Sequence, residues 1–137
     1  MQLEVYQRET EVMTHRQVNI LESVCKRLKN GEELDALEEN GVLHALQLLI
    51  ENAIGKAKHL LKSMDIPVPT SAYDTFKELA QQKYIEKSRL DEWYAIIGLR
   101  NKIVHDYMNI DMRQVYKILD ERLDRNVVEF LLQPVVK

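Results

Sequence analysis

Apolar residues recur at helical spacing along most of the chain. The first such segment runs from about Leu3 to Leu28, and it predicts one long amphipathic helix. Its apolar stripe consists of residues at seven-residue intervals, Tyr6, Met13 and Ile20, with Leu3, Gln17 and Val24 beside them. Asn30 and Gly31 follow, and such a pair is typical of a helix C-terminus.

The most apolar stretch, Val42 to Leu61, predicts the central helix of a bundle. We expect only a short polar turn or helix over residues 32–40, with Gly41 as a break before the helix. One face of the helix is apolar: Leu43, Leu46, Ile50, Ala53, Ala57 and Leu61. Gly55 in its interior costs about 1 kcal/mol relative to alanine, so we expect a close approach of another helix there.

Three further helices are predicted in the second half of the chain. Thr70 or Ser71 caps one that ends near Gln82, with Tyr73, Phe76, Leu79 and Ala80 facing inward. Residues 88–91 resemble the capped start of the next, which continues through Trp93 into residues 100–107. Asp111 begins the last, and Pro134 ends it. Since no strand-like alternation appears, we predict an all-α fold, an antiparallel bundle of about five helices in a single domain of residues 1–137.

Composition narrows the classes of function. The chain has 137 residues and a net charge of −3, which argues against broad, non-specific nucleic-acid binding but leaves room for a local basic cleft. No apolar run approaches the length of a membrane span, so we expect no membrane association. The single cysteine, Cys25, excludes an intrachain disulfide, and we expect it to be buried. Together with a polar N-terminus, this favours a cytoplasmic protein.

The segment Arg100 to Tyr107 concentrates the groups that could carry chemistry. Arg100 falls within the apolar stripe of its predicted helix, so it must be paired, face a cleft, or lie at an interface with another chain. His105 follows five residues later, about 140° around an ideal helix and roughly 7.5 Å along it. Tyr107 lies about two turns beyond Arg100 on the same face. A cleft at the end of this helix would receive all three side chains.

These groups suit acid–base cleavage of a phosphodiester. His105 would move a proton to or from a ribose oxygen, and Arg100 would bind the phosphate. The structural alternative is that Arg100 pairs with a buried acid and His105 caps a helix end, and spacing alone favours it. Glu51 is either a partner of Arg100 or an ordinary rim carboxylate. No metal-ligand spacing and no glycine-rich phosphate loop appear, so we expect neither a metal nor a cofactor.

The segment Gly98 to Tyr107 resembles the Arg-x4-His-x-Tyr motif of HepT-type toxins of the HEPN superfamily. Residues 109–111, which open the last helix, and residues 51–55 also resemble that family, and the resemblance spans about residues 10–130. It implies a helical bundle that forms a homodimer, with two motifs facing one cleft. Its expected activity is that of a metal-independent endoribonuclease toxin. Asn101 matches the polar position of the motif.

The resemblance also implies a partner and a means of neutralisation. The partner is an MNT-type nucleotidyltransferase antitoxin, and Tyr107 would accept AMP from ATP. That modification would place bulk and negative charge where RNA binds. Two alternatives remain: a non-catalytic HEPN module that uses Arg100 and His105 to bind a nucleotidyltransferase or another protein, and an unrelated bundle whose motif is a coincidence.

Overall fold

The computed structural model describes residues 2–134, apart from the side chains of Gln2 and Leu3, and within that range every regular element is helical. The elements are α1 (Gln2–Lys29), α2 (Ala36–Ser63), α3 (Ala72–Gln81), η1 (Lys87–Arg89), α4 (Leu90–His105), η2 (Tyr107–Asn109), α5 (Met112–Asp120) and α6 (Asp124–Leu132). The all-α prediction is confirmed. Six α-helices in the described range replace the expected five because the last predicted helix is divided in two.

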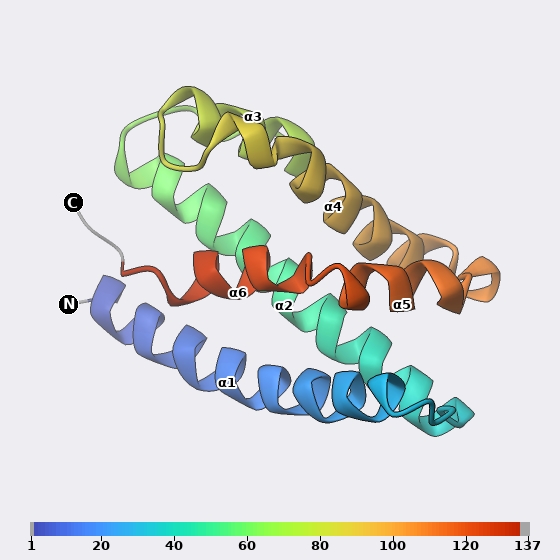
Figure 1. The fold of residues 1–137 in the computed structure, drawn as a ribbon. Helices are drawn as coiled ribbons and strands as arrows, with labels where there is room; N and C mark the ends of the chain where they lie inside the picture. Colours follow the sequence, from blue (N-terminus) through green and yellow to red (C-terminus); the bar gives the residue numbers. More distant parts are fainter. Residues whose placement is uncertain (1, 135–137) are drawn as a thin grey trace.

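Helix α2 is the centre of the bundle, as predicted. It contacts α1 on one side and α3 and α4 on another, and α6 also packs against it. Figure 1 shows α1 and α2 as two long helices, with α4 on the far side of α2 from α1 and with α5 and α6 between them. Within residues 2–134, no helix is long and apolar enough to cross a membrane.

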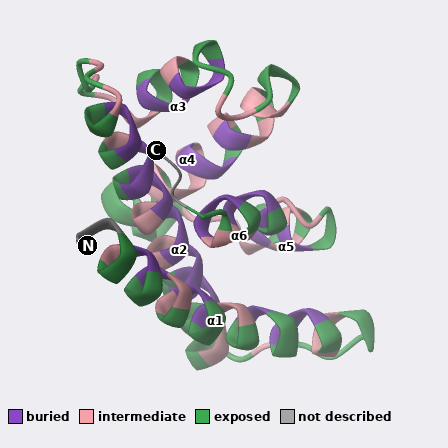
Figure 2. Ribbon diagram, turned by 90° about the vertical axis from the view of Figure 1, so that its left-hand side faces the viewer, coloured by how far each residue is buried: buried purple, intermediate pink, exposed green. Residues whose placement is uncertain are grey.

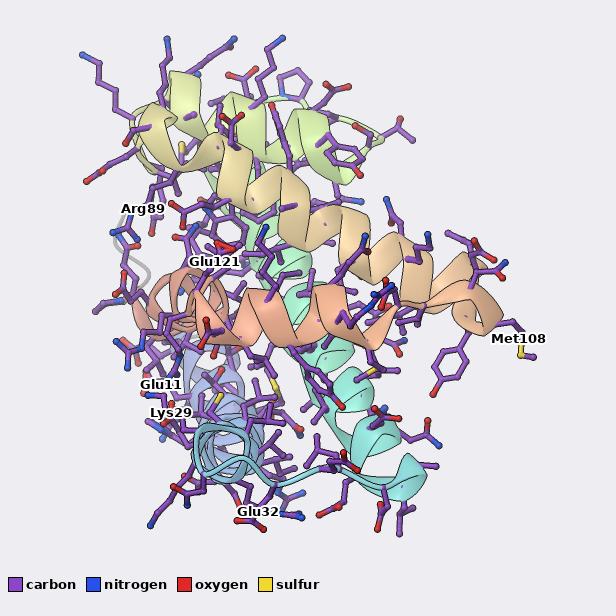
Figure 3. All side chains as sticks on the ribbon, turned by 45° about the vertical axis from the view of Figure 1, so that its right-hand side comes forward. Glu11, Lys29, Glu32, Arg89, Met108 and Glu121 are labelled. Carbon is purple, nitrogen blue, oxygen red and sulfur yellow. The ribbon has the colours of Figure 1, made fainter. Side chains whose placement is uncertain are left out.

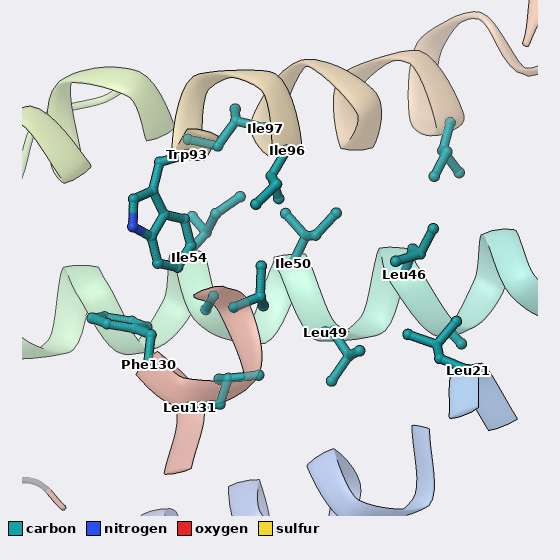
Figure 4. Packing of buried hydrophobic residues seen from close by; sticks show 14 of the residues in the cluster. Leu21, Leu46, Leu49, Ile50, Ile54, Trp93, Ile96, Ile97, Phe130 and Leu131 are labelled. Carbon is teal, nitrogen blue, oxygen red and sulfur yellow. The ribbon is translucent and has the colours of Figure 1, made fainter. Parts of the chain in front are cut away.

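The core is built on α2 and closed by aromatic residues of three other helices. Phe76 of α3 stacks on Trp93 of α4 at 4.2 Å between ring centroids, and Phe130 of α6 meets Trp93 edge-on at 5.3 Å. Leu49, Ile50 and Leu60 of α2 are fully buried beneath them. Figure 4 shows this packing, and Figure 2 shows that burial follows the inner faces of the helices. Helix α4 is thereby fixed against α2 along its length.

The predicted start of α2 is wrong. The helix begins at Ala36 because Asp35 and Glu38 form a reciprocal cap, in which the Asp35 carboxylate accepts from the Glu38 amide at 2.8 Å. Gly41 lies inside the helix, because its cost of about 1 kcal/mol is offset by a cap of similar magnitude. A side chain at Gly55 would meet the Tyr6 hydroxyl at 3.7 Å, an ordinary contact, so the expected close approach is also wrong.

The predicted inward stripe of α1 is only partly confirmed: Gln17 and Val24 are buried and Met13 packs against the core, but Ile20 is exposed. The residues of α1 that face the core are mostly polar: Gln7, Thr10, Thr14, Gln17, Leu21, Val24 and Cys25. Two of these polar side chains have internal partners: the Thr14 hydroxyl donates to the Thr10 carbonyl at 2.6 Å, and the Gln7 amide donates to the Leu131 carbonyl at 3.1 Å. Ile20 is left 41% exposed, while burial of Cys25 is confirmed. Leu3, also expected on the stripe, lies outside the described side chains.

Two helix boundaries in the second half also differ from prediction. Arg122 adopts a φ of 58° between α5 and α6, which ends one helix and starts the next. Its guanidinium is held by Glu22 at 2.5 Å and by the buried Asp124 at 3.4 Å. Apolar positions continue in register across this break, so periodicity did not reveal it. Ser88 does not cap α4, because it lies within η1 and its hydroxyl contacts Glu86, the residue before η1.

Lys56 ties α2 to the C-terminal end of α6. Its side chain is fully buried, and its ammonium donates to the carbonyls of Phe130 at 2.8 Å, Leu131 at 3.1 Å and Gln133 at 2.5 Å. These carbonyls belong to the end of a helix, which attracts a cation. Burial lowers the pKa of Lys56 to about 8.

Candidate active site at the end of α4

Arg100 lies in the last two turns of α4, where that helix packs against α2. Its Nε is 3.4 Å from Oε2 of Glu51 on α2, and its NH1 donates to Oδ1 of Asn101 at 2.9 Å. Of the three predicted environments for Arg100, the structure provides the first, an acidic partner within the chain. The Arg100 side chain is nevertheless 28% exposed, so the guanidinium also reaches solvent.

Asn101 links Arg100 to an aromatic pair that the sequence did not single out. Its amide lies 3.5 Å from the hydroxyl of Tyr73 on α3, and Tyr73 meets Tyr94 of α4 edge-on at 5.5 Å. Tyr73 was expected to face inward, but it is 38% exposed. Thr75, two residues further along α3, faces inward instead and is fully buried. Its hydroxyl donates to the carbonyl of Ser71, the residue that caps α3, at 2.8 Å. No sequence signal distinguished Tyr73 from the core aromatics.

His105 is the final residue of α4, and its side chain is exposed. The helix stops there because Asp106 leaves helical geometry, with φ of −147°, and its carboxylate accepts from the Asn109 amide at 2.6 Å. The preceding residue, Val104, is 41% exposed. No hydrogen bond or ion pair joins the His105 side chain to another residue in the part of the chain that the structure describes, so its imidazole is open to a ligand.

Tyr107 does not continue the face of Arg100, and that prediction is wrong. It begins η2, and its hydroxyl donates to Oδ1 of Asn40 in the second turn of α2. The ring is 45% exposed at the tip of the bundle, next to Met108, which projects fully into solvent (Figure 3). The structure therefore places Tyr107 beside the N-terminal end of α2 instead of two turns along α4.

A second tyrosine, Tyr116, contacts Glu39, the residue of α2 that precedes Asn40. The hydroxyl of Tyr116 on α5 lies 2.5 Å from Oε2 of Glu39. Burial and this hydrogen bond to a carboxylate raise the pKa of Tyr116 to about 12. Tyr116 is thus an anchored, neutral phenol, whereas the more exposed Tyr107 contacts an uncharged amide. The two side chains have similar positions along α2 but different chemistry.

The structure brings some of the predicted groups into direct contact and leaves others as neighbours. Glu51, Arg100 and Asn101 form one connected polar cluster. His105 follows on the next helical turn, and Tyr107 on η2 beyond it. The cluster can bind a phosphate through the guanidinium, and the exposed imidazole can exchange a proton nearby. Among the described residues, no group of three or more metal-ligating side chains is gathered.

Comparisons with known proteins identify the family and the fold. The model of the family described as ribonuclease HepT-like matches residues 14–132. The mRNA nuclease HepT of Shewanella oneidensis is 30% identical over 86 residues, which make up 63% of this chain and 65% of that protein, so the match spans less than two thirds of its length.

Two solved structures share the fold. One is a toxin–antitoxin complex with AMP-PNP, with a TM-score of 0.76 and 22% identity over 92% of this chain and 97% of that one. The other is a tri-AMPylated Shewanella oneidensis HEPN toxin in complex with an MNT antitoxin, with a TM-score of 0.76 and 23% identity over 92% and 96% of the two chains. At these identities, the likeness establishes the fold.

Proposed function

Because this chain belongs to the ribonuclease HepT-like family, we propose that it is an endoribonuclease toxin that cuts RNA at the end of α4. The observation that carries the proposal is the position of Arg100 and His105, one held by Glu51 and Asn101 and the other free at the helix terminus. The relative named an mRNA nuclease supports the substrate class.

The proposed reaction uses the nucleophile that RNA supplies. His105 takes the proton of a ribose 2′-hydroxyl, the 2′-oxygen attacks the adjacent phosphorus, and the bond to the 5′-oxygen of the next nucleotide breaks. The protonated His105 then gives this proton to the leaving 5′-oxygen, and a 2′,3′-cyclic phosphate remains. Arg100 offsets the negative charge that grows on the phosphate oxygens. Each step uses only side chains of the protein and the RNA itself, and this is why we propose a reaction without a metal.

Glu51 and Asn101 then have a positioning role. An arginine in a bidentate grip must present a fixed face to the phosphate, and two contacts on one guanidinium restrict its rotation. The negative charge of Glu51 also reduces the cost of keeping Arg100 partly buried before RNA binds. Glu51 also weakens the binding of phosphate to Arg100, because its carboxylate competes with the RNA for the same guanidinium.

We propose a homodimer in which this end of the molecule faces a second copy. Large apolar side chains are exposed around the site, with Leu37 80% exposed and Met108 92% exposed beside Val104 and Tyr107. Exposed apolar residues gathered at one place favour an interface. A second chain would cover them and form one wall of an RNA cleft.

We further propose that an MNT-type nucleotidyltransferase neutralises the protein by transfer of AMP to Tyr107. Tyr107 is exposed, and its hydroxyl has an uncharged partner in Asn40, so it is reachable. The solved HEPN toxin that is tri-AMPylated in complex with an MNT antitoxin supports this role. Tyr116 is the matched control, because its hydroxyl is held by Glu39 and its pKa is raised to about 12.

The test combines purified protein, RNA and a chelator. We expect RNA to be cut in the presence of EDTA and the products to carry 2′,3′-cyclic phosphates. After incubation with a nucleotidyltransferase partner and ATP, we expect AMP on wild-type protein and on Tyr116→Phe but not on Tyr107→Phe. Intact RNA under all conditions would reject the ribonuclease, and modification of Tyr107→Phe to the wild-type extent would reject the assigned acceptor.

One observation favours the alternative of a non-catalytic module. Arg100 already has an acidic partner in Glu51, as a purely structural arginine would. In that case Arg100 and His105 bind a partner protein, and RNA stays intact while the complex with the nucleotidyltransferase still forms. The same incubation therefore separates the two functions.

A further inference from the structure

Helix α1 carries an apolar stripe that the bundle leaves uncovered. Val5 is 46% exposed, Val12 69% and Ile20 41%, and Met13 beside them is only half-buried. The sequence pattern assigned Ile20 and the neighbouring Met13 to the core, yet a mostly polar side of α1 packs inward and Ile20 stays exposed. A helix that presents apolar residues on its outer side at regular spacing is typical of one that packs against a further helix.

The uncovered stripe is continuous and contains two opposite charges. Its members follow one another at intervals of four, three, four and four residues: Val5, Glu9, Val12, Arg16 and Ile20. This spacing keeps them on one side of a helix. A groove of about 650 Å³ runs along it, bounded on the α2 side by Leu48. Neither Glu9 nor Arg16 has a hydrogen-bond or ion-pair partner within the described part of the chain.

The stripe is complementary to itself when it is reversed. When two copies of one helix pair antiparallel about a two-fold axis, the numbers of any two facing residues add up to the same value. An axis between Val12 and Met13 sets that sum to 25, so Glu9 of one copy meets Arg16 of the other, and Val5 meets Ile20. Val12 and Met13 of both copies then gather at the axis. Every position of the stripe meets a suitable partner, and the two-fold axis makes the Glu9–Arg16 ion pair occur twice.

We propose that α1 is a self-association surface, on which a second copy of this chain lays its own α1 antiparallel, with Glu9 paired to Arg16 across the interface. A different protein could cover an apolar stripe, but the match of charges in one reversed register specifically favours a copy of the same helix. Leu48 of α2 widens the surface, because the groove beside it receives side chains of the second copy.

This surface is separate from the candidate active site. Helices α1 and α4 lie on opposite sides of α2 (Figure 1), and Arg100 belongs to α4. The proposal therefore does not depend on ribonuclease activity. A chain that also pairs through the end of α4 has two different self-contacts, and it assembles beyond a dimer.

Charge reversal with rescue tests the proposal. Sedimentation velocity of the full chain is compared for wild type, Glu9→Arg, Arg16→Glu and the double variant Glu9→Arg/Arg16→Glu. Each single variant places like charges opposite each other, so we expect association through α1 to weaken at least tenfold and the mass to fall to half. The double variant restores opposite charges in the same register, so we expect the wild-type mass to return.

Two further variants serve as controls. Lys26→Glu changes an exposed charge of α1 outside the stripe, and we expect no change in mass. Val12→Asp places a carboxylate at the axis, and we expect dissociation with an unchanged helical circular-dichroism spectrum. The proposal is overturned by a wild-type mass equal to that of Glu9→Arg, or by a double variant that stays dissociated. RNA cleavage is not a readout here, so loss of the proposed activity would leave this result unaffected.

Discussion

The buried lysine of α2 predicts an unusual dependence of stability on pH. Lys56 is fully buried, and burial lowers its pKa from 10.5 to about 8. Between those values the unfolded chain holds one more proton than the folded chain, so the free energy of unfolding rises with pH. The contribution is complete above pH 10.5 and is lost as pH falls through 8. With these two pKa values the rise between pH 7 and pH 9.5 is about 2 kcal/mol.

A methionine at position 56 removes the titrating group but keeps most of the buried chain. Lys56→Met leaves the carbonyls of Phe130, Leu131 and Gln133 without their donor, so at pH 7 we expect a loss of roughly 1–3 kcal/mol. We also expect the rise above pH 8 to disappear. Burial raises the pKa of the Cys25 thiol, which lowers stability as pH rises above 9, but this affects both proteins equally.

Urea unfolding at several pH values, followed by fluorescence of the single, buried Trp93, measures both quantities. Lys62→Met, on the exposed side of the same helix, is the control and should keep the wild-type pH dependence. If wild type and Lys56→Met show the same pH dependence, then the three carbonyls stabilise the ammonium as much as burial destabilises it. In that case burial would not lower the pKa of Lys56.

Three further substitutions follow from the structure. Gly55→Ala meets nothing closer than 3.7 Å in a helix interior, so urea unfolding should show a gain of about 0.5–1 kcal/mol. Gly31→Ala forces alanine to a φ of 78°, and the same measurement should show a loss of about 1 kcal/mol. Glu51→Gln removes the charge that holds Arg100, so single-turnover RNA cleavage should slow about tenfold or more with little change in unfolding; an unchanged rate would make Glu51 an ordinary rim carboxylate.

Helix content and the central position of α2 were predictable because apolar spacing reports which segments are helical. Periodicity says less about which side of a helix faces inward. In α1 it pointed to Tyr6, Met13 and Ile20, but Thr10 and Thr14 are buried, and the Thr14 hydroxyl is satisfied by the Thr10 carbonyl. An apolar stripe thus identifies a helix face that packs against another surface. It does not distinguish a surface of the same chain from that of another chain.

The candidate site was predictable in its residue types but only partly in its geometry. The charge of Arg100 within an apolar face required a partner, and Glu51 is that partner. The position of Tyr107 could not be predicted from a helical wheel, because the helix ends at His105 where Asp106 bonds Asn109. A local side-chain bond of this kind competes with the helix and is invisible to apolar periodicity. Tyr73 was missed for a related reason, since exposed and buried aromatics look alike in sequence.

The central claim is that His105 cuts RNA with the 2′-hydroxyl as nucleophile. The most direct measurement is the single-turnover rate of purified protein on an RNA and on the same sequence with 2′-O-methyl groups. The account predicts cleavage of the RNA alone, a loss of about 100-fold or more in His105→Ala, and full activity in His15→Ala, whose exposed histidine lies on α1. Equal cleavage by His105→Ala and wild type, or cleavage of the methylated strand, would contradict it.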